Sequence, residues 1–417
     1  MAGREDDVAR PEQLTEILGA AYRQPERFLT NLAFWKQRLG PHEAICTRLR
    51  DGEVLEVDLQ DAKGRLWTFR ARIGLEPPYR IEFWSVRRPL PPGATLRRAT
   101  ESDGDAIAAV ERACPIERDD GSRVTLVRGS SLLDQVRLAE WGGIWLVEED
   151  GSPIACDGRL AHHTRIGRRD VSLVYRFHTR VKPSHRRLGL NETLAVMLTE
   201  EQLQAVGAVD GFYVYVDPRN QVIRDWSRTP AWRVRPLRAL LRCDAVAEPT
   251  AARPAIPTDA ARIAALLDSA HDGEELYLPR AAEAIIQRLT RAPERYGFKH
   301  MWIDEFAVVG VWEDGEERTL ERDGALDVSV RATVLDWGFA RGTAEGLRSL
   351  ERLLRSWCAH LATRGVTHIS LFFSHASPAA PILARLAESV IDVEFQCTVA
   401  EPATATELGL HVDPIYY

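Results

Sequence analysis

The sequence lacks any hydrophobic run long enough to cross a membrane, because no stretch reaches the roughly 18 consecutive apolar residues that a membrane helix needs. Its first residues, Met1 to Asp7, are polar and acidic, and they lack the apolar segment of a secretory signal peptide. On these grounds we expect a cytoplasmic protein without a membrane partner.

Cysteine is also scarce, with six residues in a chain of 417. No two cysteines have the spacing of a CxxC pair or of a metal site. Most of them stand beside apolar residues, which favours reduced, buried thiols over a disulfide framework. The sequence therefore predicts neither disulfides nor a metal site.

Excess positive charge is absent as well, since 54 Lys and Arg face 61 Asp and Glu, for a net charge of −7. This balance argues against general nucleic-acid binding, which needs a basic surface. What is present is ordinary for a globular chain, with 45% hydrophobic and 28% charged residues. The length indicates two or three domains.

A local basic turn stands out against this acidic background. It follows a β-branched run that ends at Val181, reads Arg186-Arg187-Leu188-Gly189-Leu190-Asn191, and opens a helix-like segment. Unpaired N–H groups at a helix start lie at the positive end of the macrodipole, so they attract a pyrophosphate. Gly189 would let the backbone approach closely. Such turns also occur in surface loops without a ligand, so both interpretations stay open.

An internal repeat divides the rest of the chain. Arg97-x-Ala99-x-x-x-Asp103-x-x-x-Ile107 recurs as Arg253-x-Ala255-x-x-x-Asp259-x-x-x-Ile263, 156 positions later. In each copy the aspartate or its neighbouring hydroxyl residue can cap a helix with apolar residues at helical spacing. The helix-like segment 192–207 and the strand-like segment 211–216 recur at the same offset.

Three domains follow from this organisation. Residues 93–247 form the first copy and 248–417 the second copy, joined by a small-residue and proline linker. Residues 1–92 are predicted as a small α+β module, with helices in 12–40 followed by an antiparallel meander of three strands near 54–59, 66–73 and 79–86.

Three pieces of the first copy, in this order, resemble the GNAT acetyltransferase superfamily. They are the strand and Asp-led helix from Leu96 to Val110, the Arg186-x-x-Gly189-x-Asn191 turn, and the strand from Phe212 followed by Asn220. The resemblance covers residues 94–245. It implies two tandem GNAT-like domains of the α+β or α/β class, with mixed, mainly antiparallel sheets.

The resemblance also implies an acyl-CoA donor, acetyl-CoA or another acyl-CoA. The main chain of Thr179, Arg180 and Val181 would pair with its pantetheine arm as a neighbouring strand does. The pyrophosphate would lie on the turn, and the donor site predicted in this way contains Arg186, Arg187, Leu188, Gly189, Leu190, Asn191 and Asn220. The acceptor would be a small-molecule amine, acylated directly in a ternary complex by a monomer or homodimer.

Tyr175 and His178 are the candidate catalytic residues. Strand alternation puts Tyr175, Phe177 and Thr179 on one face and His178 on the other, so one of the two candidates would face the reacting carbon. A Tyr or a His within a strand more often has a structural role than a catalytic one. Trp226 stands where the family usually has a Tyr that donates a proton to the CoA thiolate. An indole N–H cannot serve as that general acid. The general acid and base therefore stay open.

The second copy lacks the pyrophosphate cradle, that is, the basic turn 186–191 of the first copy. Glu345 stands where the equivalent of Gly189 is expected, and its carboxylate would repel a pyrophosphate. We therefore expect the second copy to be a structural partner that shares a buried sheet edge with the first copy.

The end of the chain, 411–417, either packs on its own domain or docks into a groove. Two other functions stay open: a catalytically silent binding protein, and a transferase with a longer acyl-CoA or an aminoacyl carrier as donor.

Overall fold

The computed structural model describes residues 54–60, 66–73, 81–87, 90–118, 120–186, 188, 190–207, 209–216, 232–244, 252–397, 399 and 409–413. The chain divides into two compact units. One comprises Met1–Thr95 and Ser184–Ala208, and the other Leu96–Pro183 and Val209–Tyr417.

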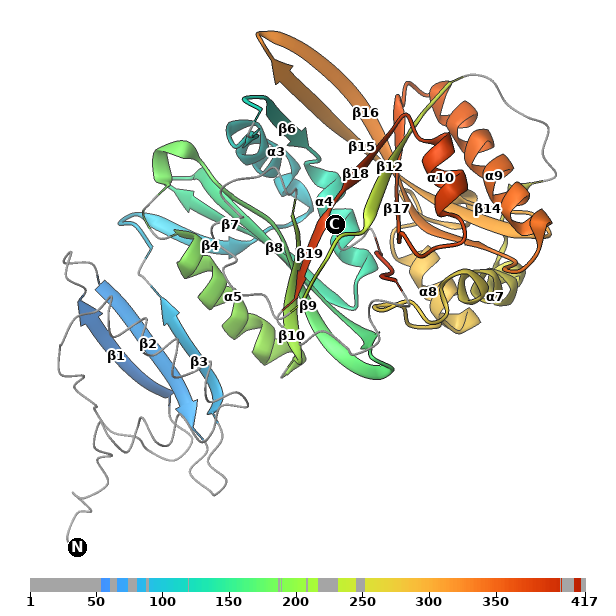
Figure 1. The fold of residues 1–417 in the computed structure, drawn as a ribbon. Helices are drawn as coiled ribbons and strands as arrows, with labels where there is room; N and C mark the ends of the chain where they lie inside the picture. The colour runs from blue at the N-terminus through green and yellow to red at the C-terminus, as the bar shows by residue number, and fades with distance from the viewer. Residues whose placement is uncertain are drawn as a thin grey trace, which may run out of the picture. The chain divides into compact units, whose positions relative to one another are not determined.

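The smaller unit contains a three-stranded antiparallel sheet. Its strands are β1 (Val54–Gln60), β2 (Leu66–Ile73) and β3 (Ile81–Arg87), in that order. Helix α5 (Leu190–Val206) belongs to this unit and lies next to β3 (Figure 1). The strands coincide with the predicted meander, whereas the helices expected in 12–40 lie outside the described residues.

The first sheet of the larger unit has seven strands in the order β11-β19-β10-β9-β8-β7-β4. β9 and β10 pair in parallel, and β7, β8 and β9 pair antiparallel in turn. Helices α3 and α4 lie against β8 and β7. The bounds are β4 (Ala94–Arg98), η1 (Glu101–Asp103), α3 (Gly104–Ala113), α4 (Ser130–Leu138), β7 (Trp141–Glu149), β8 (Ser152–Ile166), β9 (Arg169–Val181), η2 (Pro183–His185), β10 (Gly211–Val216), β11 (Trp232–Val234) and β19 (Glu394–Cys397).

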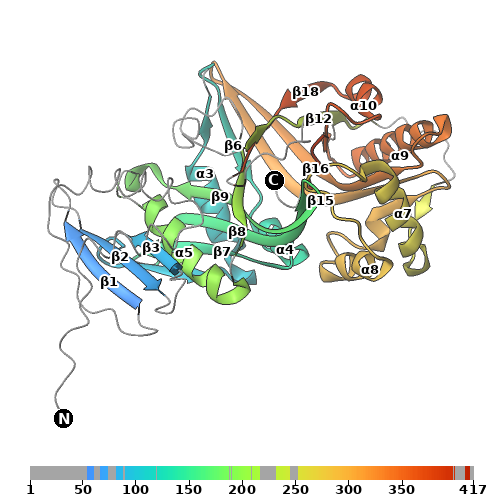
Figure 2. The ribbon, with the colours of Figure 1, turned by 60° about the horizontal axis from the view of Figure 1, so that its bottom comes forward.

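The second sheet runs β13-β14-β15-β16-β17-β12-β18, with β6 added beside β15 and β5 beside β6. Only β16 and β17 pair in parallel among these described strands. Helices α7 and α9 lie against β15 and β16 (Figure 2). The bounds are β5 (Ile116–Glu117), β6 (Arg123–Val127), β12 (Leu237–Arg242), β13 (Arg253–Pro254), η3 (Pro257–Asp259), α7 (Ala260–His271), α8 (Ala282–Arg291), η4 (Phe298–His300), β14 (Met301–Ile303), β15 (Ala307–Arg322), β16 (Ala325–Phe339), α9 (Ala344–Ala362), β17 (His368–Phe373), α10 (Ala380–Leu386) and β18 (Ser389–Asp392).

The repeat found in the sequence is present in local detail. The Asp103 carboxylate accepts from the backbone N–H of Thr100 at 2.7 Å and pairs with Arg97 at 2.7 Å. Asp259 does the same 156 positions later, accepting from the backbone N–H three residues before it at 2.9 Å and pairing with Arg253 at 2.7 Å. Each aspartate satisfies a backbone donor before a helix begins, which is why the two copies enter their first helices alike.

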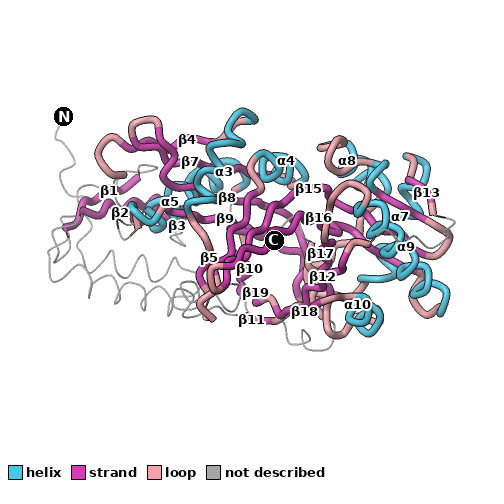
Figure 3. Tube along the Cα trace, turned by 90° about the horizontal axis from the view of Figure 1, so that it is seen from above, coloured by secondary structure: helices cyan, strands magenta, loops and turns pink. Residues whose placement is uncertain are grey.

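The two copies exchange strands. β12, from the first copy, pairs with β17 and β18 of the second sheet, and β19, from the second copy, pairs with β10 and β11 of the first sheet (Figure 3). β6 of the first copy also pairs with β15. The expected shared sheet edge is therefore present, at three places. One hydrophobic core cluster correspondingly joins residues of both copies, such as Ile107, Leu160 and Leu267.

The described cysteines are all free thiols, as the sequence predicted, and they are Cys114, Cys156, Cys243, Cys358 and Cys397. Cys46 lies outside the described residues. Among the described helices, none combines the length and the apolar character needed to span a membrane.

Candidate functional site

Strands β9 and β10 part at the predicted donor site. Their parallel ladder ends where Tyr175 lies opposite Tyr213. β9 nevertheless continues to Val181, while β10 turns to its other neighbour and pairs with β19 up to Val216. Two adjacent strands that stop pairing while both continue leave room for a strand-like ligand between them.

A bulge interrupts β9 just beyond this point. The pairing between β8 and β9 shifts between Cys156 and Gly158, and His178 has a φ of 55°, which is unusual for a residue other than glycine. The Cys156 thiol donates to the His178 carbonyl at 3.5 Å. A Cβ on Gly158 would lie 2.5 Å from the Phe177 ring, so only glycine fits opposite the bulge.

The bulge corrects the face assignment made from strand alternation. The sequence predicted Thr179 on the same face as Tyr175 and Phe177. The Thr179 hydroxyl instead donates to Asp157, the carboxylate to which Arg176 donates at 3.0 Å. Thr179 and Arg176 therefore share one face, because the extra residue at the bulge reverses the alternation after Phe177.

An aromatic cluster lines the place where β9 and β10 part. It consists of Tyr175, Phe177, Tyr213, Tyr215 and Phe395. Tyr175 is 3% exposed and stacks on Phe177 and Tyr213, with ring centroids 5.3 and 5.1 Å apart. The Tyr213 hydroxyl forms a hydrogen bond with His162 Nε2 at 2.8 Å. Burial holds the pKa of Tyr215 well above its usual value, so this phenol stays protonated at neutral pH.

The His178 side chain belongs to a buried polar group. Its Nδ1 lies 3.2 Å from Arg128 Nη2, and its Nε2 lies 3.3 Å from Glu111 Oε1 without hydrogen-bond alignment. A guanidinium only donates, so Nδ1 accepts and the ring proton is on Nε2, facing the carboxylate. Burial, with the charges of Arg128 and Arg180, holds the pKa of His178 well below its usual value. The ring is neutral and its lone pair is engaged, which favours a structural role.

Glu111 is a residue that the sequence interpretation missed. It lies on α3, is 1% exposed, and accepts from the backbone N–H groups of Arg128 and Gly129 at 2.9 Å each. Burial raises its pKa, although the nearby Arg128 opposes that shift. A signal was available, because Glu111 follows Ile107 and Val110 at helical spacing and so interrupts an apolar stripe with a charge.

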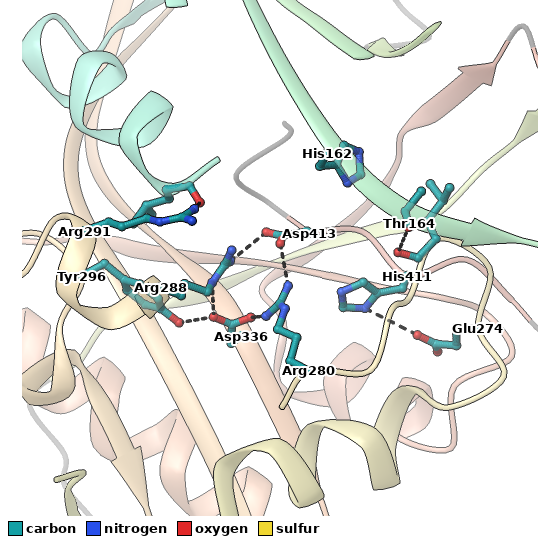
Figure 4. Close-up of polar contacts among 12 residues, drawn as sticks. His162, Thr164, Glu274, Arg280, Arg288, Arg291, Tyr296, Asp336, His411 and Asp413 are labelled. Carbon is teal, nitrogen blue, oxygen red and sulfur yellow. Dashed lines mark hydrogen bonds and ion pairs between the residues drawn. The ribbon is translucent and has the colours of Figure 1, made fainter. Parts of the chain in front are cut away.

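The end of the chain packs on the second copy. The backbone N–H of His411 donates to the carbonyl of Glu275 at 2.9 Å. Asp413 pairs with Arg280 at 2.9 Å and with Arg288 at 3.0 Å (Figure 4). The tail is therefore held up to Asp413 by its own domain, and residues 414–417 lie outside the described part of the chain.

The predicted donor residues fall into three groups. Thr179, Arg180 and Val181 end β9, where the ladder to β10 has stopped. Four others belong to the smaller unit, at and before the start of α5, and they are Arg186, Leu188, Leu190 and Asn191. Arg187, Gly189 and Asn220, as well as Trp226, lie outside the described residues. The pyrophosphate cradle therefore stays a prediction.

In the second copy, side chains of the same segment occupy the corresponding helix start, that of α9. Thr343 Oγ1 accepts from the Gly346 N–H at 3.0 Å. Glu345 places a carboxylate in the first turn of α9 and pairs with Arg348 and Arg352, each at 2.9 Å. A phosphate would meet an occupied donor and a like charge there, which supports the expectation that this copy is a structural partner.

Comparison with solved structures gives a fold match over almost the whole chain. A Saccharomyces cerevisiae N-myristoyltransferase with bound myristoyl-CoA matches with a TM-score of 0.56 at 10% identity, covering 89% of this chain and 93% of that one. A structure of the same yeast protein with myristoyl-CoA and inhibitors also matches at 0.56 and 10% identity, over 90% and 93%. No protein-family model and no curated protein matches the sequence. The chain thus has the tandem GNAT fold that the sequence predicted, with mixed, mainly antiparallel sheets.

Proposed function

We propose that this protein is an acyl-CoA-dependent N-acyltransferase, with acetyl-CoA as donor and a small-molecule amine as acceptor. The observation that carries the proposal is the parting of β9 and β10 at Tyr175 and Tyr213. Beyond that point, β9 runs into the basic turn and α5. The edge of β9 suits a pantetheine arm, and the basic turn that follows it in the sequence suits a pyrophosphate.

The transfer is direct. The amine nitrogen attacks the thioester carbon, the carbon–sulfur bond breaks, and the amine loses one proton while the CoA thiolate gains one. We assign the proton donor for the thiolate to Tyr175, because it lies where the two strands part and its phenol O–H can donate a proton. His178 is proposed to act through the bulge that it occupies, since its ring is engaged by Arg128 and Glu111.

A longer acyl chain is the second candidate donor. The aromatic cluster offers an apolar wall at the point where the strands part. The yeast protein with the same fold was crystallised with myristoyl-CoA. Acetyl-CoA and myristoyl-CoA therefore belong in the same titration, and the ratio of their affinities decides between the two donors.

The test is calorimetric titration of the full chain with each CoA ester. Arg186→Glu combined with Gly189→Glu should weaken donor binding at least 100-fold, because it replaces the cationic turn with two carboxylates. Arg341→Glu combined with Ala344→Glu is the matched control, since both residues are exposed and the pair makes the same charge change at the start of α9 in the second copy. It should leave the affinity unchanged.

Turnover is then measured as thiol release over a panel of small amines. Tyr175→Phe should lower the rate at least tenfold and leave donor affinity unchanged, as expected for a lost proton donor. Unchanged donor affinity in the double variant would contradict the assigned cradle. Donor binding without turnover on any amine would instead favour the catalytically silent alternative.

A further inference from the structure

Two histidines and a glutamate meet beside the C-terminal tail of the larger unit. His271 ends α7, Glu274 lies in the following turn, and His411 belongs to the tail. One ligand atom from each lies within 4.8 Å of the other two, and no other group of this kind occurs among the residues that the structure describes. All three side chains are buried or nearly so.

Main-chain contacts hold the three residues in place. The N–H of Glu274 donates to the carbonyl of His271 at 2.9 Å, closing a turn in which Gly273 has a φ of 88°. This turn brings the His271 and Glu274 side chains together. The tail is attached to the next residue, because Glu275 donates to the carbonyl of Gly409 at 3.0 Å and accepts from His411 at 2.9 Å.

The hydrogen bond of His271 to Trp337 leaves its second ring nitrogen facing the middle of the group. Its Nε2 lies 2.7 Å from the carbonyl oxygen of Trp337, which can only accept, so the ring N–H is on Nε2. The other nitrogen, Nδ1, lies 2.8 Å from Glu274 Oε2. At this distance either a second ring proton or a metal ion lies between Nδ1 and the carboxylate oxygen. A backbone carbonyl on the far nitrogen is also the usual outer partner of a metal-bound histidine.

We propose that His271 Nδ1, Glu274 Oε2 and His411 Nδ1 bind one divalent transition-metal ion of the Zn²⁺ class. Two imidazoles and one carboxylate, with a fourth position for water, form a ligand set that zinc takes. Bonds of about 2.1 Å in a tetrahedron put the ligand atoms about 3.4 Å apart. Glu274 Oε2 lies 2.8 Å from His271 Nδ1. It lies 3.7 Å from His411 Nδ1, a contact that Figure 4 shows. These distances lie on either side of that value, so a shift of the Glu274 side chain by about half an ångström fits the ion.

Metal at this site ties the tail to α7. His411 stands two residues before Asp413, which pairs with both Arg280 and Arg288. An ion held by His271, Glu274 and His411 therefore adds a second anchor to the segment that leads to the end of the chain. This inference is independent of the proposed acyl transfer, and its readouts are metal affinity and thermal stability.

The test uses the full chain after dialysis against a chelator, titrated with Zn²⁺ and, as a spectroscopic probe of coordination, with Co²⁺. The wild-type protein should bind one equivalent. His411→Gln and Glu274→Gln should each weaken binding at least tenfold, because each removes a ligand. His375→Gln is the matched control, since His375 lies on the surface, 66% exposed, and 3.9 Å from Asp392. It should bind as the wild type does.

Saturating Zn²⁺ should also raise the melting temperature of the wild type and of the His375 variant, but not that of His411→Gln. His411→Gln is preferred to a change at His271, which is buried against Trp337 and whose loss could unfold the protein. Absence of saturable binding, or equal affinity in wild type and His411→Gln, overturns the proposal. So does ¹⁵N NMR that finds both His271 nitrogens protonated at pH 8 and unchanged by Zn²⁺.

Discussion

Three buried histidines, His162, His178 and His300, are neutral in the folded protein. Burial lowers the pKa of His162 to about 4, although the nearby Asp413 opposes that shift. Burial also lowers the pKa of His178 and of His300, the latter to about 4. An unfolded chain binds protons at these sites below about pH 6.5, whereas the folded chain does not. Their contribution to stability is therefore present above pH 6.5 and lost as the pH falls towards 4.

His162→Gln should reduce this acid sensitivity, because glutamine can keep a hydrogen bond to the Tyr213 hydroxyl and does not titrate. Between pH 7.5 and pH 5, one such histidine costs about 2 kcal/mol of unfolding free energy. Urea unfolding at the two pH values should show a smaller loss in the variant by that amount. His163→Gln, at an exposed neighbour, is the control. An identical pH dependence in His162→Gln and wild type would contradict a buried neutral ring.

At the scale of single elements, β9 illustrates which features are local. The alternation of apolar residues from Val171 to Phe177 predicts a strand, and a strand is present. The bulge at His178 has no such signal, because it depends on which residue of β8 lies opposite. Gly158 was the only available sign, as a glycine inside a strand can mark a close approach. The bulge decides where the side chains of His178 and Thr179 point.

Gly158→Ala should destabilise the protein by about 1–3 kcal/mol, since the added methyl group forces the Phe177 ring out of its position. Urea unfolding measures the loss. Phe177→Leu in the same chain should restore part of it, because a leucine leaves room for the methyl group. If the two substitutions are additive in the double variant, the predicted contact between residues 158 and 177 is absent.

For the molecule as a whole, exchange of β12 and β19 makes the two copies dependent on each other. A chain cut at the predicted boundary between 247 and 248 leaves β12 on one fragment and its partners β17 and β18 on the other. β19 is separated from β10 and β11 in the same way. Each fragment would expose unpaired strand edges and half of a shared core.

We therefore expect fragments 1–247 and 248–417, expressed separately, to lack cooperative thermal unfolding, and a mixture refolded together to regain it. Calorimetry of each fragment and of the mixture measures this. Two fragments that each unfold cooperatively on their own would show that the exchanged strands are dispensable. The boundary at 247 would then divide independent domains.

The sequence by itself determined the features that depend on near neighbours. The two capping aspartates, Asp103 and Asp259, the offset of the repeat and the free thiols are of this kind, because a cap or an amphipathic stripe involves residues a few positions apart. These local patterns, together with the resemblance, were sufficient to predict the tandem GNAT fold.

Only the tertiary structure decided which sheet each exchanged strand joins, that Glu111 meets His178, and that His411 meets His271. These contacts join residues far apart in the chain. The burial of apolar faces and the pairing of strand edges determine these contacts. A local sequence pattern does not show which distant residue will be the partner. Tyr175 and His178 therefore stay predictions made from their positions along β9, while their partners and orientation came from the tertiary structure.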